Sequence, residues 1–353
     1  MSNWTDYLAS HGARFHIDEA TQAEDFGRTL SVADLGAGFV APVTDLGLIA
    51  VAGEDAASFL HNQLTNDVEH LGSGDARLAG YCTPKGRLQA TFLYWRDAQA
   101  VYLQLPRAIQ APLQKRLGMF VLRAKAKLRD ATGEDAFAAV LGIGGAGGEA
   151  ALRAQVGELP AAPYSKTSGG QGTVIRLLDA FGAPRYLWLS SGATAQAALP
   201  ALTAAGLALG GNAAWRLAAI HAGVPQVTGP TQEQFVPQMV NLELLGGVNF
   251  KKGCYPGQEI VARSQYLGKL KRRTALATVE NAAARAGDDV FSAADPEQPC
   301  GMVVNAAPNG LGGADLLVEI KLAALEQDVR HGSAAGPALR FQPMPYPLDA
   351  LDL

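Results

Sequence analysis

Cysteine is scarce in this sequence, whose 353 residues include only Cys82, Cys254 and Cys300. An odd number of widely spaced cysteines excludes a complete framework of intrachain disulfides, and no CxxC pair marks a metal site. A single thiolate also falls short of the four protein ligands that usually hold an iron–sulfur cluster. We therefore expect no permanently bound metal and a reducing, cytoplasmic environment.

Long uninterrupted hydrophobic runs are also missing. The N-terminal residues MSNWTDYLASHGARF lack the basic start and apolar run of a secretory signal. The longest stretch without a charged residue spans residues 186–215, but serine, glycine, proline and asparagine interrupt it. It therefore predicts strand, helix and loop rather than a membrane helix, and we expect no membrane partner.

The motifs of common hydrolases and nucleotide-binding enzymes are absent or incomplete. The histidines form no HExxH pattern and there is no GxSxG elbow, so zinc-hydrolase and serine-hydrolase chemistry lack support. We interpret His61 and His70 as surface or cap histidines. Gly142, Gly144 and Gly147 satisfy GxGxxG, but no acid follows about 20 residues later to bind a ribose. These glycines are better interpreted as a structural loop than as a nucleotide site.

The sequence does contain regular strand and helix patterns. Residues 46–53 and 88–105 alternate apolar and polar side chains, with a turn at DAQA, and predict strands. Between them, apolar residues at helical spacing follow Asp55, a residue type favoured at the N-cap, and predict a short amphipathic helix. Together these elements indicate a sheet with a helix packed on it.

A second unit is predicted after the first. A helical pattern over residues 107–117 precedes FVLRAKAKLRD, residues 120–130, where basic and apolar residues alternate as in a strand with one basic face. Strand, helix, strand, strand and helix patterns follow between residues 133 and 210. This order is close to the split βαβ arrangement of a ferredoxin-like unit.

The last part of the chain changes character. Asn212 is expected to cap a helix that ends at Gly223, with a proline just beyond. Past residue 270, short strand patterns such as TALATV, GMVVNAA and LLVEIKL are separated by glycine, asparagine and proline. They predict a small all-β C-terminal domain.

The segment KKGCYPGQEIVARSQYLGKLKRR, residues 251–273, differs most from the rest of the chain. It holds seven basic residues and one acid, whereas the whole chain has a net charge of −4. Such local positive charge favours an anionic ligand over general nucleic-acid binding, with a solvated lysine-rich face as the alternative.

Cys254 lies within this basic segment. The sequence QEIVARSQYL predicts a short helix ending at Gly268, so that Cys254 precedes a helix N-terminus with Lys251 and Lys252 nearby. The helix dipole and the two cations both favour the thiolate, which attacks electrophiles or binds soft metals. The alternative is an inert core cysteine, because free cysteines are often buried. The residues alone leave both alternatives open.

The run KGCYPGQEIVAR resembles the signature of the YgfZ family, folate-binding-type proteins linked to iron–sulfur cluster assembly and repair. FLHNQLTNDV with YCTPKGR, the block from IHAGVPQV to NFKKGC, and GMVVNAA are similar to other parts of that family, so the likeness covers most of residues 46–310. The positions that match the signature are Lys252, Gly253, Cys254, Tyr255, Gly257, Gln258, Glu259 and Arg263.

The family shares its fold with the aminomethyltransferase (GcvT) of the glycine cleavage system. The resemblance therefore implies an α+β chain with a mixed α/β folate-binding-type domain in two pieces, an inserted ferredoxin-like domain and a small C-terminal β-barrel. It implies tetrahydrofolate as a ligand in a central opening. On this sequence the expected bounds are 1–110 with 212–270, then 111–211, and 271–353.

The resemblance also implies roles for individual residues. Cys254 would be the working thiol, and Lys252 would tune it or contact the ligand. The glutamate tail of folate would meet Lys252, Arg263 and the basic face with Arg123, Lys125 and Lys127. The residues expected to bind the folate are Lys252, Tyr255, Gln258, Glu259, Arg263 and His221.

Two departures from related sequences affect these expectations. Aminomethyltransferases carry a catalytic acidic pair shortly after the glycines that match Lys85-Gly86, where this chain has Gln89-Ala90. Without a carboxylate there, aminomethyl transfer is disfavoured. His221 stands where relatives usually have a glutamate that can hydrogen-bond the pterin, and imidazole offers fewer acceptors.

The leading hypothesis is an accessory protein that supports iron–sulfur cluster assembly or repair in client enzymes or on an assembly scaffold. It would bind a folate-type small molecule and no nucleic acid. One alternative is a tetrahydrofolate-dependent one-carbon transferase, acting on aminomethyl groups or removing methyl groups. Another is a folate sensor whose cysteine is structural.

Overall fold

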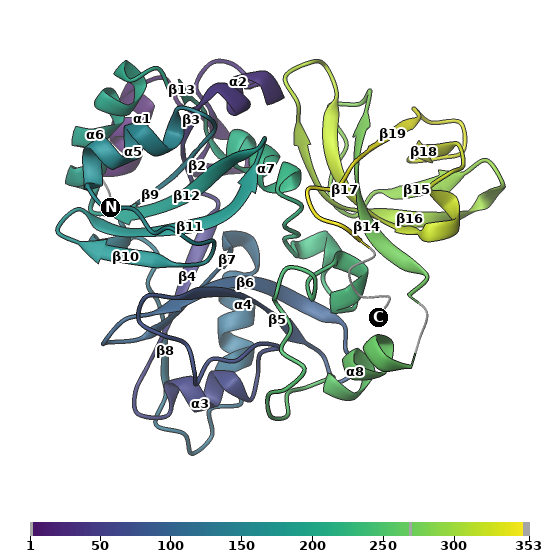
Figure 1. Ribbon diagram of the computed structural model, residues 1–353, viewed down its shortest axis with the longest axis horizontal. Coiled ribbons are helices and arrows are strands. Elements are labelled where there is room, and N and C mark those ends of the chain that lie inside the picture. The colour runs from purple at the N-terminus through teal and green to yellow at the C-terminus, as the bar shows by residue number, and fades with distance from the viewer. Residues whose placement is uncertain (1–2, 268–269, 349–353) are drawn as a thin grey trace.

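The computed structural model of the chain describes residues 3–267 and 270–348. Gly268, expected to end a helix, and Lys269 of the basic segment lie outside the described residues. Three bodies, each built on its own large sheet, surround a common centre (Figure 1). No helix in the described ranges is long and apolar enough to span a membrane.

The first body is a five-stranded antiparallel sheet with strand order β5-β6-β7-β4-β8. Both faces of the sheet are buried, because Leu48 and Ala50 of β4 enter one core while Ile49 and Val51 enter another, where α3 and α4 pack. The elements are β4 (Leu46–Ala52), α3 (Ala56–His61), β5 (Ala76–Cys82), β6 (Leu88–Arg96), β7 (Val101–Pro106), α4 (Arg107–Gly118) and β8 (Lys127–Asp130).

The second body is a six-stranded sheet with strand order β10-β11-β12-β9-β3-β13. Helices α1, α5 and α6 contribute to the core on one face, and α7 packs toward the other. Its elements are α1 (Asn3–Ser10), α2 (Val32–Ala37), β3 (Phe39–Pro42), β9 (Ala139–Gly144), α5 (Gly148–Val156), β10 (Lys166–Gly169), β11 (Gly172–Ala180), β12 (Ala183–Ser190), α6 (Gly192–Ala204), β13 (Ala208–Leu209) and α7 (Asn212–His221), with a separate hairpin of β1 (Arg14–His16) and β2 (Glu19–Asp25).

The third body is the small all-β domain that the sequence predicts. Its six strands, in the order β18-β15-β16-β17-β14-β19, curl into a half-barrel, and α8 (Gln258–Tyr266) precedes it in the chain (Figure 1). The strands are β14 (Arg272–Val279), β15 (Asp289–Ser292), β16 (Asp295–Pro308), β17 (Ala314–Lys321), β18 (Val329–His331) and β19 (Leu339–Gln342).

The sheets divide the chain at other points than the expected bounds. Strand β3, from the N-terminal part, pairs with β9 in the second sheet, whereas α4 and β8 belong to the first body. The segment FVLRAKAKLRD therefore does not open the second unit. Its strand covers only Lys127–Asp130, and Leu122, with φ 44°, lies in the turn before it. An alternating pattern predicts a strand but not its partner, because pairing is a long-range contact.

Two expected helix caps are replaced by other contacts. Asp55 precedes α3, but its carboxylate accepts a hydrogen bond from the backbone N–H of Lys125 at 2.7 Å instead of capping the helix. Asn212 is the first residue of α7, and its side-chain oxygen accepts from the N–H of Thr44 at 2.8 Å. Both side chains join segments distant in sequence, so each is used for tertiary contact.

The glycines of the GxGxxG pattern lie where the chain packs on itself. A Cβ on Gly142 would lie 2.2 Å from Cε3 of Trp215, and one on Gly144 would lie 2.8 Å from Cε1 of Phe39. Neither position tolerates a side chain without movement. The protein itself fills the space beside this loop, in agreement with the structural interpretation.

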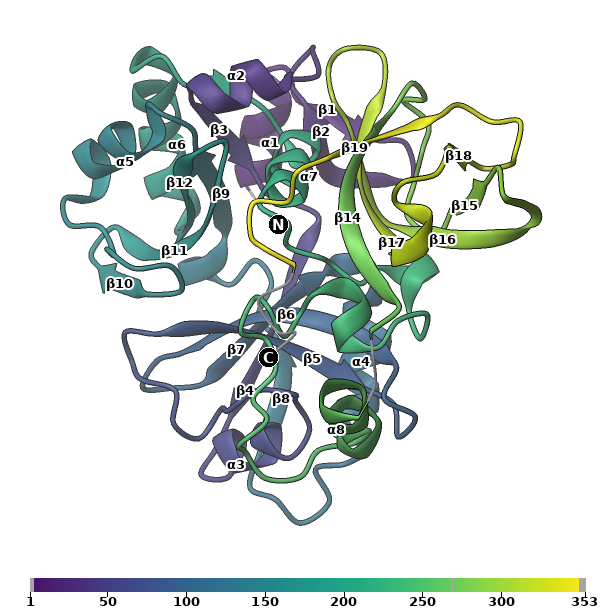
Figure 2. The same ribbon diagram turned by 45° about the vertical axis from the view of Figure 1, so that its right-hand side comes forward.

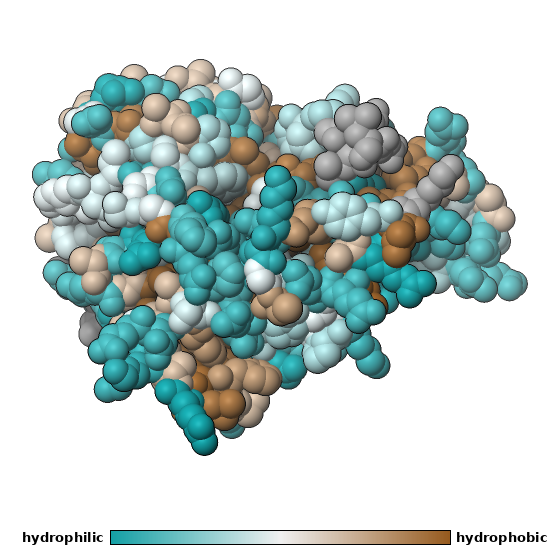
Figure 3. Space-filling model, turned by 60° about the horizontal axis from the view of Figure 1, so that its bottom comes forward, coloured by the Kyte–Doolittle hydropathy of each residue, from teal (hydrophilic) through white to brown (hydrophobic). Residues whose placement is uncertain are grey.

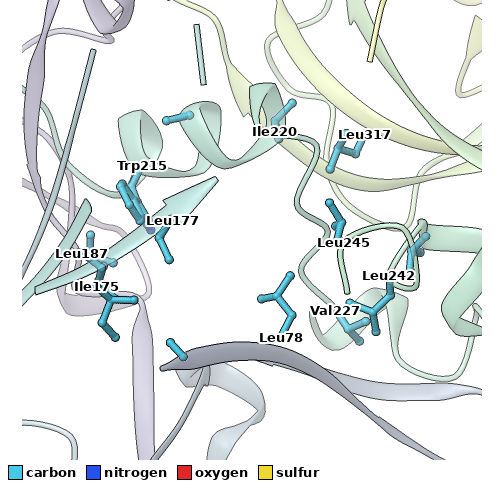
Figure 4. Close-up of a cluster of buried hydrophobic side chains, with 14 of the residues drawn as sticks. Leu78, Ile175, Leu177, Leu187, Trp215, Ile220, Val227, Leu242, Leu245 and Leu317 are labelled. Carbon is cyan, nitrogen blue, oxygen red and sulfur yellow. The ribbon is translucent and has the colours of Figure 1, made fainter. Parts of the chain in front are cut away.

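The largest core cluster lies where the three bodies meet (Figure 4). Leu78 comes from the first sheet, Leu177 from the second, Leu317 from the third, and Trp215 from α7. The close-up shows Leu177, Leu78 and Leu245 pointing toward a shared space. The centre of the molecule is therefore both a junction and a place where a cavity can form.

Candidate functional site

A cavity of about 770 Å³, counting the part open to solvent, lies at this junction. Within it, about 90 Å³ is open to the centres of water-sized molecules. Its apolar walls include Leu78, Leu93, Leu177, Trp215, Val224 and Leu242. Its polar residues include Asp45, Thr91, Gln104, Tyr164, Arg185 and Gln226.

Three buried polar atoms on cavity-lining residues have no hydrogen-bond partner within the described residues. They are Oδ1 of Asp45, the hydroxyl of Tyr164 and one terminal nitrogen, Nη1, of Arg185. Buried polar groups are nearly always paired, because an unpaired one costs free energy. The set offers an acceptor, a hydroxyl and a cationic donor to a ligand.

Arg185 is the most unusual of these residues. It is 2% exposed, and it has no ion pair within the described residues. Its Nε donates to the backbone oxygen of Leu178 at 3.0 Å, and its guanidinium carbon lies 5.0 Å from the ring centroid of Trp215. Burial lowers the pKa of Arg185 to about 10 because water no longer solvates the charge. An acceptor supplied by a ligand would offset this cost.

One carboxylate oxygen of Asp45, another cavity residue, is already paired within the protein. Its Oδ2 accepts from Arg216 at 2.6 Å, and Arg216 also pairs with Glu24. Burial would lower the pKa of Arg216, but these two carboxylates outweigh it and raise the pKa. Arg216 is thus held as a cation by the protein, while Oδ1 of Asp45 is left for another partner.

None of the residues that line the cavity belongs to the segment 251–263. The loop before α8 lies against the first body instead, where a Cβ on Gly257 would come within 2.5 Å of the backbone oxygen of Thr83. Figures 1 and 2 both show α3 and α8 at the end of the first body that points away from the other two. The residues expected to bind folate lie in this loop and in α8, and they do not line the cavity: Lys252, Tyr255, Gln258, Glu259 and Arg263.

His221 does not line the cavity either. Its Nε2 lies 2.6 Å from Oδ2 of Asp315 in the half-barrel, and its ring contacts Phe181. Asp315 also accepts from Thr278 and Asn309. His221 therefore joins α7 to the third body. It lies outside the cavity in which the folate ligand was expected.

The place of the catalytic acidic pair is occupied by residues that point in different directions. Ala90 packs in the core under α3 and α4, and the Nε2 of Gln89 donates to Glu233 at 2.9 Å. Of residues 88–91, Thr91 lines the central cavity, where its hydroxyl accepts from the N–H of Val227 at 3.0 Å. This part of the cavity wall carries a hydroxyl and no carboxylate.

The thiol of Cys254 is exposed, whereas Cys82 and Cys300 are buried. Burial raises the pKa of the Cys82 thiol to about 12 and raises that of Cys300 as well. Within the described residues, no group of three or more histidine, cysteine or acidic side chains is arranged to hold a metal. Cys254 is thus the cysteine that solvent and partners can reach.

Lys252 is held tightly beside this thiol. Its Nζ donates to the backbone oxygen of His61 at 2.6 Å and lies 4.8 Å from the ring centroid of Tyr255. Burial lowers the pKa of Lys252 to about 8, against the opposing influence of Asp67 and Cys254. The face at the lower end of Figure 1 carries both hydrophilic areas and hydrophobic patches (Figure 3). The exposed hydrophobic side chains of α8 and its end are Ile260, Tyr266 and Leu267.

The basic residues expected to hold the glutamate tail lie on the surface, away from the cavity lining. Lys125 pairs with Glu54 at 2.7 Å, and Arg129 pairs with Glu134. Neither Arg123, Lys125 nor Lys127 lines the central cavity. These charges are spread over an exposed turn and a short edge strand.

Comparison with known proteins places this structure in context. No family model matches the sequence. The chain is 30% identical over 314 residues to the tRNA-modifying protein YgfZ of Serratia proteamaculans (strain 568), covering 86% of this chain and 91% of that one. It is 34% identical over 224 residues to the protein of that name from Edwardsiella ictaluri (strain 93-146), covering 64% of this chain and 66% of that one.

A solved structure shares the fold. The glycine cleavage system aminomethyltransferase T from Bartonella henselae aligns with a TM-score of 0.75 over 96% of each chain, at 15% sequence identity. This likeness confirms the α+β, GcvT-like architecture expected from the sequence. With 30% identity over nine-tenths of a curated relative, the chain belongs to the family of the tRNA-modifying protein YgfZ.

Proposed function

We propose that this protein binds a folate-type ligand in the central cavity and supports iron–sulfur enzymes through the thiol of Cys254. The observation that carries the first half is the buried guanidinium of Arg185 at the cavity wall, whose Nη1 has no hydrogen-bond partner within the described residues. The second half rests on the exposure of Cys254 and on the cationic Lys252 beside it.

A folate head group suits the cavity chemically. A pterin is flat and aromatic, and it presents a carbonyl oxygen beside ring N–H and amino donors. The oxygen would accept from Arg185, and a donor would reach Oδ1 of Asp45. The flat ring would pack between apolar walls such as Trp215 and Leu242.

The ligand half is tested by calorimetric titration with tetrahydrofolate. Tyr164→Phe and Asp45→Asn remove single polar functions from the cavity, and each is expected to weaken binding about tenfold. Lys252→Ala and Arg263→Ala are matched controls outside the cavity, expected to bind like the parent. Absence of binding by the parent protein would remove folate from the proposal.

The thiol half is tested in cells. Cys254→Ala, expressed in a strain that lacks the native protein, is expected to leave iron–sulfur enzymes impaired under oxidative stress. Cys300→Ala is the control, since that thiol is buried in the half-barrel. Full rescue by Cys254→Ala would refute a working thiol.

The relatives' name refers to tRNA modification. On our proposal this chain would act on tRNA indirectly, through a client iron–sulfur enzyme that performs the modification. The net charge of −4 favours this over direct tRNA binding, which depends on basic surfaces. A salt-sensitive complex between purified protein and tRNA would contradict it.

A one-carbon transferase is the alternative, favoured by one observation. Asp45 brings to the cavity a carboxylate whose Oδ1 has no partner within the described residues, although Gln89-Ala90 stands where the acidic pair was expected. A carboxylate is the group that could move the proton in such a reaction. The test is whether the protein releases formaldehyde or methylenetetrahydrofolate from aminomethyl or N-methyl donors. Release by the parent protein that is lost in Asp45→Asn would establish the transferase in place of the accessory role.

A further inference from the structure

The loop that carries Cys254 lies against the C-terminal end of α3, at His61. The side chain of His61 is nine-tenths buried, and its Nδ1 lies 3.1 Å from Oδ1 of Asp67. The amine of Lys252 donates to the backbone oxygen of His61 at 2.6 Å, which ties the two segments together. A histidine and a carboxylate are therefore fixed beside the exposed thiol segment.

The hydrogen bond to Asp67 sets the tautomer of His61. A carboxylate accepts, so Nδ1 carries the proton and Nε2 keeps its lone pair. This Nε2 has no hydrogen-bond partner within the described residues. It faces residue 253, since Nε2 would be the nearest atom to a Cβ on Gly253, at 3.7 Å, apart from atoms of the adjoining residues.

We propose that Cys254, His61 and Asp67 form a nucleophile, base and orienting carboxylate. Nε2 of His61 accepts the proton from the sulfur of Cys254: the S–H bond breaks, an N–H bond forms, and Asp67 stabilises the imidazolium. The inference rests on the proposed role of Cys254 and adds the groups that would make its thiol reactive. Gly253 contributes by leaving the space beside Nε2 open.

The charged groups around His61 favour this proton transfer. Asp67 also accepts from Nδ1 of the exposed His70 at 2.9 Å, and Glu69 lies 4.0 Å from Nδ1 of His61. Burial would raise the pKa of Asp67, but hydrogen bonds from His70 and the nearby imidazoles outweigh it and lower the pKa. The carboxylate thus stays ionised, and Lys252 supplies a positive charge for the thiolate.

The thiolate would act on a disulfide. Its sulfur attacks one sulfur of the disulfide, a mixed disulfide with Cys254 forms, and the second sulfur leaves as a thiolate. The bonds balance without an added oxidant or reductant. Because Cys254 is exposed and lies outside the central cavity, the disulfide of a partner protein or of a small molecule can reach it.

The test is the rate at which a chromogenic aromatic disulfide reacts with purified protein between about pH 5.5 and 9. His61→Gln is expected to slow the reaction at pH 7 about tenfold or more and to move the midpoint of the rate–pH profile upward. Asp67→Asn is expected to move the profile in the same direction by less. His70→Gln, which changes the other partner of Asp67, is the matched control and should react like the parent.

A His61→Gln protein that folds and keeps the parent rate and profile would overturn the inference. Should His61→Gln fail to fold, an unchanged profile in Asp67→Asn would overturn it equally. These outcomes are separable from the proposed function, because tetrahydrofolate titration and rescue by Cys254→Ala do not depend on His61. The buried Cys82 and Cys300 keep the assay specific for Cys254.

Discussion

The guanidinium of Arg185 lies over the ring of Trp215, with 5.0 Å from its carbon to the ring centroid. The ring face offers partial negative charge, but it does not replace a carboxylate. The protein therefore keeps an incompletely satisfied cation at the wall of its central cavity. Proteins tolerate such groups where a ligand uses them.

Replacement of Arg185 by methionine tests this interpretation. With a pKa lowered to about 10 from 12.5, the buried charge costs roughly 3 kcal/mol at neutral pH. Arg185→Met removes that cost together with the Trp215 contact and the bond to Leu178. We expect the free energy of unfolding in urea to stay level or rise, while tetrahydrofolate binding falls at least tenfold. A large loss of stability would indicate a structural role.

For the buried ion pair Arg273–Glu243, by contrast, we expect that removing one charge lowers the free energy of unfolding. The Arg273 side chain is 5% exposed and that of Glu243 is fully buried, and they join the first strand of the half-barrel to the loop at residues 237–247. Burial raises the pKa of Glu243 despite Arg273. Glu243→Gln leaves a buried cation without its partner, so we expect a loss of about 3–5 kcal/mol in urea unfolding.

The double variant Arg273→Met with Glu243→Leu is the control for that prediction. Removing both charges leaves no unpaired ion, so the loss should be clearly smaller than in Glu243→Gln. A double variant at least as unstable as the single one would show that packing at this site matters more than charge.

Local patterns predicted much of the fold. Strand β4, the β6–β7 hairpin and the elements β9, α5, β11, β12 and α6 follow from alternation and helical spacing, which neighbouring residues set, whereas β10 was not predicted. The grouping of strands into sheets did not follow. β8 reads as a strand, but only its pairing with β4 tells which sheet it joins.

The central cavity was harder to predict than the thiol segment. Cys254 and Lys252 lie in one short motif, while Asp45, Tyr164 and Arg185 come from distant parts of the chain and meet only in the folded protein. One signal was present: Arg185 is a charged residue in the apolar strand RYLWLS. Charges in buried strands usually mark a partner or a site. His61 carried no comparable signal, because its relation to Gly253 is purely tertiary.

Acid stability should depend on Asp315. Burial would raise its pKa, but hydrogen bonds from His221, Asn309 and Thr278 outweigh it, so the pKa is lowered on folding. A lowered carboxyl pKa contributes stability above the unfolded value near 4 and loses it as pH falls through the folded value. Asp315→Asn should thus be less stable than the parent at pH 6.

The difference between the two proteins should shrink steadily below about pH 4. Thermal unfolding followed at half-unit steps from pH 6 to pH 2.5 measures it. Asp328→Asn, at an exposed pair with Arg330, is the control and should track the parent at every pH. A gap between Asp315→Asn and the parent that stays constant across the range would contradict the linkage.

His221→Glu, the change that restores the residue usual in relatives, should not improve folate binding. His221 lies outside the cavity lining, and its Nε2 is 2.6 Å from Asp315. A glutamate there would place two carboxylates together in a largely buried site, where like charges repel strongly. We expect a lower melting temperature at pH 7, partly regained at pH 5 as one carboxylate takes up a proton, and no gain in affinity for tetrahydrofolate. His221→Gln, which keeps a hydrogen-bond donor for Asp315, should lose less stability. Tighter tetrahydrofolate binding by His221→Glu would show that α7 turns this side chain into the cavity when the ligand binds.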